Sequence, residues 1–130
     1  MANYTKLNLR GDVEDQAPKF GMDDLEFHTA RAPLEMENGG LSFLRIAPNY
    51  RMPFGHHHDQ QEEVYVLVNG TARLKLDDEV IELEPWDAVR IHKDTMRNLE
   101  GGPDGAEIIL FGAPNAGAGD AQMEQGWWTD

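Results

Sequence analysis

The sequence predicts an all-β fold of antiparallel strands. From Leu41 onward, short segments rich in apolar residues alternate with turn residues, a pattern typical of a β-sandwich or β-barrel. Residues 1 to about 38 are broken up by Gly and Pro and show no helical periodicity. The length of 130 residues fits one domain. We therefore expect a single all-β domain spanning residues 1–130.

Apolar alternation and turn signals locate the strands. The predicted strands lie near 25–31, 41–47, 62–68, 71–77, 79–84, 87–92, 96–100 and 106–112. Asn69-Gly70 is the strongest hairpin signal, because both residues tolerate the positive φ of a type I′ turn. Asp77-Asp78 predicts a second tight turn.

The strand near 62–68 is apolar on both faces. Val64, Val66 and Val68 point to one side, and Tyr65 and Leu67 to the other. An outer apolar face of this kind needs a cover, so we predict a homodimer.

The run Gly55-His56-His57-His58 precedes this strand and predicts a metal pocket with Glu63. On an extended segment His56 and His58 leave the same face, roughly 6.6 Å apart at Cα, and two imidazoles at that spacing can bind one ion. Glu63 would face the other side of an unbroken strand, so a turn within the polar segment 59–62 must bring it round.

The pattern His56-x-His58-x(4)-Glu63-x(6)-Gly70 resembles the first motif of the cupin superfamily, in particular small single-domain conserved-barrel cupins of the cupin-2 type. The resemblance implies an antiparallel double-stranded β-helix, a jelly-roll barrel with a core at about 41–112. Residues 1–40 and 113–130 would then form extended N- and C-terminal arms. It also implies that His56, His58 and Glu63 bind a divalent metal, with Fe, Mn, Ni and Zn as candidates.

The second motif of that family is not kept, and the residues in its five places are Trp86, His92, Asp94, Arg97 and Gly101. Arg97 stands where the family has its fourth ligand, and a protonated guanidinium has no lone pair to give to a metal. His92 stands at the turn proline, and His57 points away from its two neighbours. We expect neither of them to be a ligand.

Arg97 leaves two alternatives open. It can pair with Glu63 and repel a cation, or it can hold an anionic ligand beside a bound metal. With Arg97, the predicted ligand-binding residues are Tyr65, Phe54 and Met96. Further apolar candidates for the pocket wall are Met52 and Phe111.

Composition excludes several classes of partner. With 11 basic and 24 acidic residues the net charge is -13, so neither nucleic acid nor an anionic membrane surface is an expected partner. The absence of Cys excludes disulfides and thiolate chemistry. No apolar leader or spanning segment is evident, so we expect a cytoplasmic protein. The adjacent Trp127 and Trp128 predict that the C-terminal tail docks on the barrel or on a second subunit.

Two functions fit these observations. The first is a metal-dependent oxygenase or isomerase acting on a small organic acid that Arg97 orients. The alternative is a non-catalytic cupin that binds a small anionic ligand, with no metal or with a structural one. A sensor domain of a transcription factor is a weaker third.

Overall fold

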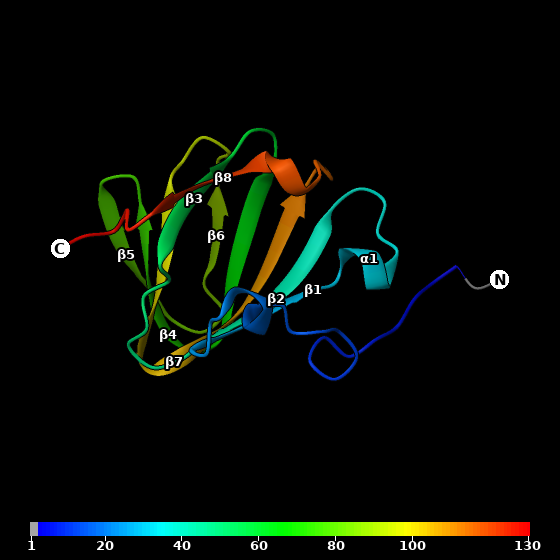
Figure 1. The fold of residues 1–130 in the computed structure, drawn as a ribbon, viewed down its shortest axis with the longest axis horizontal. Coiled ribbons are helices and arrows are strands. Elements are labelled where there is room, and N and C mark those ends of the chain that lie inside the picture. Colours follow the sequence, from blue (N-terminus) through cyan, green and yellow to red (C-terminus); the bar gives the residue numbers. More distant parts are fainter. Residues whose placement is uncertain (1–2) are drawn as a thin grey trace.

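The computed structural model describes residues 3–130, apart from the side chain of Ala118, and shows one curled eight-stranded antiparallel sheet (Figure 1). The strands are β1 (Leu25–Thr29), β2 (Gly40–Ile46), β3 (Phe54–His58), β4 (Glu62–Leu76), β5 (Glu79–Leu83), β6 (Ala88–Ile91), β7 (Arg97–Ala113) and β8 (Ala121–Gln125). The helical elements are short: η1 (Ala17–Phe20), α1 (Arg31–Leu34) and η2 (Ala118–Asp120). No helix in the described part of the chain has the length and hydropathy needed to cross a membrane.

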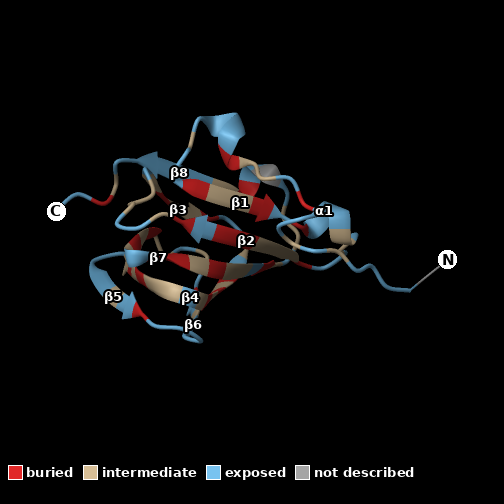
Figure 2. Cartoon of the chain, turned by 90° about the horizontal axis from the view of Figure 1, so that it is seen from below, coloured by how far each residue is buried: buried red, intermediate tan, exposed pale blue. Residues whose placement is uncertain are grey.

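The two longest strands, β4 and β7, form the frame of the barrel. β7 pairs with β4 along most of its length, with β2 over residues 106–112 and with β3 at Arg97. Inward side chains of both strands are buried, and those of Leu67, Leu74 and Ile108 are 0% exposed. Buried and more exposed residues alternate along the strands (Figure 2), as expected for a sheet with one face on a core.

The predicted hairpin at Asn69-Gly70 is wrong. The segments 62–68 and 71–77 form one strand, β4, and the segments 96–100 and 106–112 likewise belong to one strand, β7. Gly70 has φ +81 within β4, and the register with β7 shifts on both sides of it. The positive φ of Gly70 therefore belongs to a β-bulge. Tight turns and β-bulges both favour Gly at positive φ, so the same sequence signal fits either structure. The predicted turn at Asp77-Asp78 is confirmed, with Leu76 paired to Glu79 and Asp77 at φ +51.

Gly70→Ala is expected to lower the free energy of unfolding by about 3 kcal/mol. A Cβ at this position would collide with the backbone oxygen of Gly105 on β7. Gly21→Ala is the matched control, because Gly21 has φ +70 with open space around it and should lose only about 1 kcal/mol from the left-handed backbone. Urea denaturation measures both, and equal losses would contradict a steric role for the close contact between β4 and β7.

The C-terminal segment docks on the barrel, as predicted. Its strand β8, which we did not predict, pairs with β3 over the whole of Phe54–His58. Trp128 is 5% exposed, and the Arg51 guanidinium lies 4.2 Å from its ring centroid. Trp127 lies over Gly55, where a Cβ would come within 2.6 Å of the indole. A glycine beside His56 therefore leaves room for the tail to cover β3.

The N-terminal segment covers the outer face of β1 and β2. Val13 is buried, and its carbonyl oxygen lies 2.8 Å from Nδ1 of His28 on β1. The Arg10 guanidinium lies 5.6 Å from the ring centroid of Phe43 on β2. Both terminal segments thus contribute to the packing of the barrel.

Candidate metal centre

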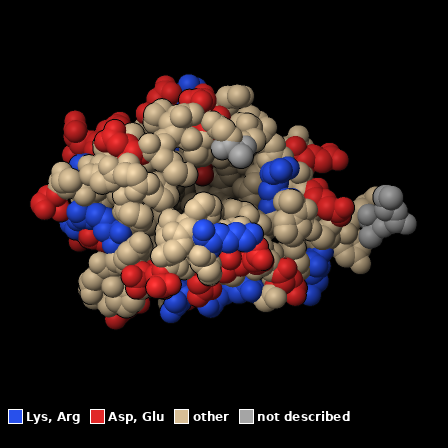
Figure 3. All heavy atoms as spheres, in the orientation of Figure 1, with Lys and Arg blue, Asp and Glu red and all other residues tan. Residues whose placement is uncertain are grey.

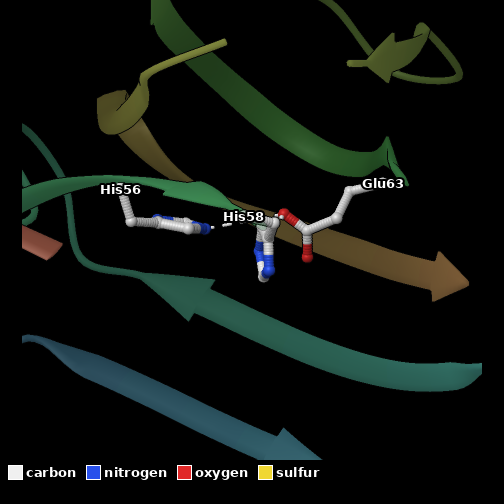
Figure 4. Close-up of side chains that lie close together, drawn as sticks. All are labelled: His56, His58 and Glu63. Atoms are coloured by element: carbon white, nitrogen blue, oxygen red, sulfur yellow. Dashed lines mark ion pairs between the residues drawn. The ribbon is translucent and has the colours of Figure 1, made fainter. Parts of the chain in front are cut away.

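The structure brings His56, His58 and Glu63 together inside the barrel (Figure 4). The two histidines lie on β3 with their side chains on the same face, and a bend at residues 59–60 turns the chain into β4, whose second residue is Glu63. Glu63 Oε1 lies 3.5 Å from Nε2 of His56 and 3.1 Å from Nε2 of His58. The turn required by the sequence is therefore present, and the three ligand atoms face one point.

Asp120, on η2, fixes the orientation of His58. The Nδ1 of His58 lies 3.0 Å from Oδ2 of Asp120, a carboxylate that is 5% exposed. An ionised Asp120 can only accept a hydrogen bond, so Nδ1 carries the proton and Nε2 of a neutral His58 has a free lone pair. Sixty-two residues separate the two side chains along the chain, and no local motif links them. Sequence reasoning missed Asp120 for that reason.

The pKa values of the cluster follow from burial and from the facing charges. Burial alone would raise the pKa of Glu63, but the facing His56 and His58 side chains outweigh it and hold the pKa well below its usual range. Burial lowers the pKa of His56. Burial would also lower the pKa of His58, yet Glu63 and Asp120 together raise it. Burial and the Glu63 charge raise the pKa of Tyr65, so its hydroxyl stays protonated and donates to Glu63 Oε1 at 3.4 Å.

Arg97 enters the site from β7 and is 0% exposed. Its Nη1 lies 3.4 Å from Glu63 Oε1, and its Nη2 donates a hydrogen bond to the His92 carbonyl oxygen at 2.9 Å. The pairing with Glu63 is a single contact and not a bidentate one. Among the described residues, the buried Nε atom has no partner, and the buried Nη1 atom has the ion pair with Glu63 but no hydrogen bond. Free hydrogen-bonding capacity on a buried cation favours an anion as a further partner.

The donor set fits a divalent metal. Nε2 of His58 is buried without a hydrogen-bond partner and, in the neutral tautomer set by Asp120, turns a lone pair toward a carboxylate oxygen 3.1 Å away. Two facing acceptors repel each other unless a proton or a metal ion lies between them. Two imidazole nitrogens and one carboxylate suit Zn, Fe, Mn or Ni, and a carboxylate behind a ligating histidine is the usual support for such a ligand. Arg97 supplies no lone pair, so the described residues offer three ligands at this point.

A cavity of about 870 Å³ opens from this cluster to the surface. The molecule is visibly hollowed there, with mostly uncharged atoms around the hollow (Figure 3). Tyr65, Phe54 and Arg97 line the cavity, together with Met52. Met96 and Phe111 do not line it. Met96 directly precedes Arg97, so strand alternation directs the two side chains to opposite faces, and Phe111 alternates in the same way with the lining residue Leu110.

The two remaining histidines of the motif regions lie outside the ligand cluster, as expected. His57 is half-buried on β3, between the two ligand histidines, and is not among the residues that line the cavity. The side chain of His92 is 58% exposed. His92 acts through its backbone carbonyl, which holds the Arg97 guanidinium. The sequence contained no signal for that contact.

Comparison with known proteins places the fold. No family model matches the chain, and no curated protein matches it by sequence. The cupin protein BF4112 from Bacteroides fragilis is 23% identical with a TM-score of 0.73, covering 91% of this chain and 90% of its own. The polyketide cyclase RemF from Streptomyces resistomycificus is 20% identical with a TM-score of 0.73, and the match covers 97% of this chain and 88% of RemF. Pac13 from Streptomyces, a nucleoside dehydratase, is 13% identical with a TM-score of 0.72, covering 96% and 92%.

These identities are low, so the likeness concerns the backbone and not the chemistry of the site. It extends over 91% of this chain for BF4112 and 97% for RemF. It agrees with the first motif, whose two histidines lie on β3 and whose glutamate lies on β4. The chain has an all-β jelly-roll fold of the cupin type.

Proposed function

We propose that this protein is a metal-dependent enzyme that acts on a small organic acid. His56, His58 and Glu63 would hold a divalent ion, and Arg97 would bind the anionic group of the substrate. The observation that carries this proposal is the buried Arg97, whose Nε and Nη1 atoms make no hydrogen bond to the described residues and lie beside a two-histidine, one-carboxylate set at the inner end of a cavity.

Each residue of the site has a distinct role in this proposal. A bound divalent ion would supply Lewis acidity and open coordination positions for a chelating acid. Arg97 orients the acid through charge-assisted hydrogen bonds. Tyr65 donates to Glu63 and restrains its carboxylate. The side chains of Arg97 and Glu63 are 0% and 11% exposed, and burial of this kind strengthens each of these interactions.

The structural neighbours support an enzyme, since RemF is a polyketide cyclase and Pac13 a nucleoside dehydratase. The second candidate, a non-catalytic binding protein, is favoured by one observation. Arg97 already contacts Glu63 at 3.4 Å, and so competes with a cation for that carboxylate.

The location of the protein in the cytoplasm stays a prediction.

Turnover separates these two functions. Protein purified without oxygen and loaded with Fe, Mn, Ni or Zn would be mixed with a panel of diketones, phenols and carboxylic acids. Oxygen consumption and the NMR spectrum of each compound report oxidation and isomerisation. Metal-dependent conversion of at least one acid supports the enzyme. If the acids bind but are not converted with any of the four metals, the result contradicts the enzyme and supports the non-catalytic binding protein.

We also propose that the protein is a homodimer, formed through the outer face of β4 and β7. Val64 is paired with Phe111 and Val66 with Ile109, and these side chains form an apolar surface that is only partly buried. Phe111 is 41% exposed. Light scattering at micromolar concentration should give twice the chain mass, and Phe111→Glu should give the monomer. A monomeric wild-type protein would contradict the proposal.

A further inference from the structure

The cavity is larger and more apolar than a two- or three-carbon acid requires. Its volume of about 870 Å³ lies near the upper end of the range for small-molecule sites. Beyond the candidate metal cluster, its walls are formed mainly by apolar side chains from the η1 region, β1, β2, the loop before β3, and β8. The largest of these are Phe20, Met22, Phe27, Tyr50, Met52 and Met123.

Two of these apolar side chains lie at the mouth of the cavity. Phe20 is 71% exposed and Met123 is 62% exposed, although both line the cavity. They come from opposite ends of the chain, since Phe20 ends η1 and Met123 lies on β8. Large apolar side chains exposed at the entrance of a cavity suit a ligand whose body is apolar.

Charge is distributed unevenly along the cavity. Arg97 is the one Lys or Arg among the described lining residues, and it lies at the inner end beside the metal cluster. Two acidic residues, Asp23 and Asp24, line the outer part and are exposed. Glu63 offsets the charge of Arg97 at the inner end, so with a divalent ion bound a negative group is attracted to the inner end and repelled at the mouth.

We propose that the ligand is a monoanionic aromatic acid, with its carboxylate or enolate on Arg97 and its ring system between the η1 segment and β8. This inference rests on the proposed function, because the acid group lies at the candidate metal centre. Beyond the proposed function, we infer that the body of the substrate is apolar. It carries one ring or two fused rings and has no second negative charge at its far end.

A series of simple acids tests this assignment by calorimetric titration of the metal-loaded protein. Affinity should rise about tenfold from acetate to benzoate and about tenfold again to 2-naphthoate, as each ring buries apolar surface. Naphthalene-2,6-dicarboxylate should bind more weakly than 2-naphthoate because of Asp23 and Asp24. The neutral 2-naphthylmethanol should lose the contribution of Arg97 and bind at least tenfold more weakly than 2-naphthoate.

Variants at the mouth locate the ring. Phe20→Ala and Met123→Ala should each weaken 2-naphthoate several-fold and leave acetate unchanged. Val80→Ala, which removes an exposed apolar side chain outside the cavity lining, should change neither. Equal affinity for acetate and 2-naphthoate, or tighter binding of the dicarboxylate, would overturn the inference. A separate titration with metal alone distinguishes the two proposals: bound metal without a gain from the rings refutes the aromatic acid only, and absence of metal binding refutes the proposed function.

A second inference concerns Asp120 and rests on different contacts. Beyond its bond to His58, its Oδ1 accepts from the backbone N–H of Gln60 at 2.8 Å, and its Oδ2 from that of Gln61 at 3.1 Å. Its own carbonyl oxygen accepts from the N–H of Asp59 at 2.9 Å. Asp120, a single residue of the C-terminal segment, thus accepts hydrogen bonds from three successive N–H groups of the turn that separates His58 from Glu63.

We infer that Asp120 is a positioning residue, which sets the tautomer of His58 and the path of the chain toward Glu63. An asparagine at this position cannot accept all three hydrogen bonds, because one of its side-chain atoms becomes a donor. Asp120→Asn should weaken metal binding about 10- to 100-fold. Asp59→Asn is the matched control, since Asp59 is an exposed neighbour whose side chain contacts Gln122.

Nitrogen NMR of labelled histidine in the metal-free protein reports the tautomer directly. At alkaline pH, the proton of His58 should lie on Nδ1 in the wild type and be redistributed toward Nε2 in Asp120→Asn. A variant with lower thermal stability but an unchanged tautomer and unchanged metal affinity would show that Asp120 only supports the fold. That result would overturn the inference.

Discussion

Glu63→Gln is expected to abolish tight metal binding, with a loss of affinity of at least 100-fold. The substitution keeps the shape of the side chain but removes the negative charge at the point where His56, His58 and Arg97 converge. A cation would then meet two neutral imidazoles and a guanidinium, a site with net repulsion. Calorimetric titration with Zn and Mn measures the effect.

The same variant should also lower the stability of the metal-free protein. Glu63 is the one carboxylate within 4 Å of the Arg97 guanidinium among the described residues, and Arg97 is 0% exposed. Removing one partner of a buried pair leaves an uncompensated charge, which costs about 3 kcal/mol. Glu62→Gln is the matched control: Glu62 is the adjacent residue, its side chain is 59% exposed, and its ion pair with Arg90 is 3.7 Å long. If both variants bind metal like the wild type, Glu63 is not a ligand.

Arg97→His is expected to raise metal affinity by tenfold or more. The imidazole would supply a lone pair where the cupin motif has its fourth ligand, and a fixed positive charge beside the ion would disappear. Arg97→Ala should also strengthen metal binding, but only because it removes the fixed positive charge beside the ion. Titration of both variants with Mn, Fe, Ni and Zn measures the change.

Anion binding should respond in the opposite direction. Arg97→Ala removes charge-assisted hydrogen bonds worth about 1.5 to 3 kcal/mol each, so an anionic ligand should bind roughly 10- to 100-fold more weakly. Arg90→Ala, a change at an exposed arginine on β6, controls for the loss of net positive charge. Unchanged metal affinity in both Arg97 variants would refute the role of Arg97 beside the ion. Circular dichroism confirms that the variants are folded.

The sequence predicted that His56, His58 and Glu63 lie together, because the determinants of this cluster are local. His56 and His58 share a face through strand alternation, and the polar segment after them turns the chain toward Glu63. The placement of Arg97 followed from alignment to the second cupin motif. Trp86 supports that alignment, since it stands at the first glycine of the motif and has φ +76, a conformation that favours glycine.

Prediction from the sequence failed for two physical reasons. One local signal can fit two different structures, and some contacts join residues that are far apart along the chain. Gly70 has the positive φ of a hairpin turn, yet the structure uses it in a bulge of a continuous strand. β8 has little apolar alternation, because it depends on pairing with β3, more than 60 residues earlier. Asp120 follows from that pairing, which brings η2 against the His58 turn. Tertiary pairing decides all three features, and local sequence does not encode them.

The metal content of the protein itself reports whether His56, His58 and Glu63 bind a divalent metal in this fold. The protein should be prepared without an affinity tag, because added histidines would bind metal independently. Elemental analysis after gel filtration, followed by titration of the metal-free protein, should give one equivalent of a transition metal per chain, lost in Glu63→Gln and kept in Glu62→Gln. Failure of the wild-type chain to bind any of Fe, Mn, Ni or Zn would contradict metal binding by these residues.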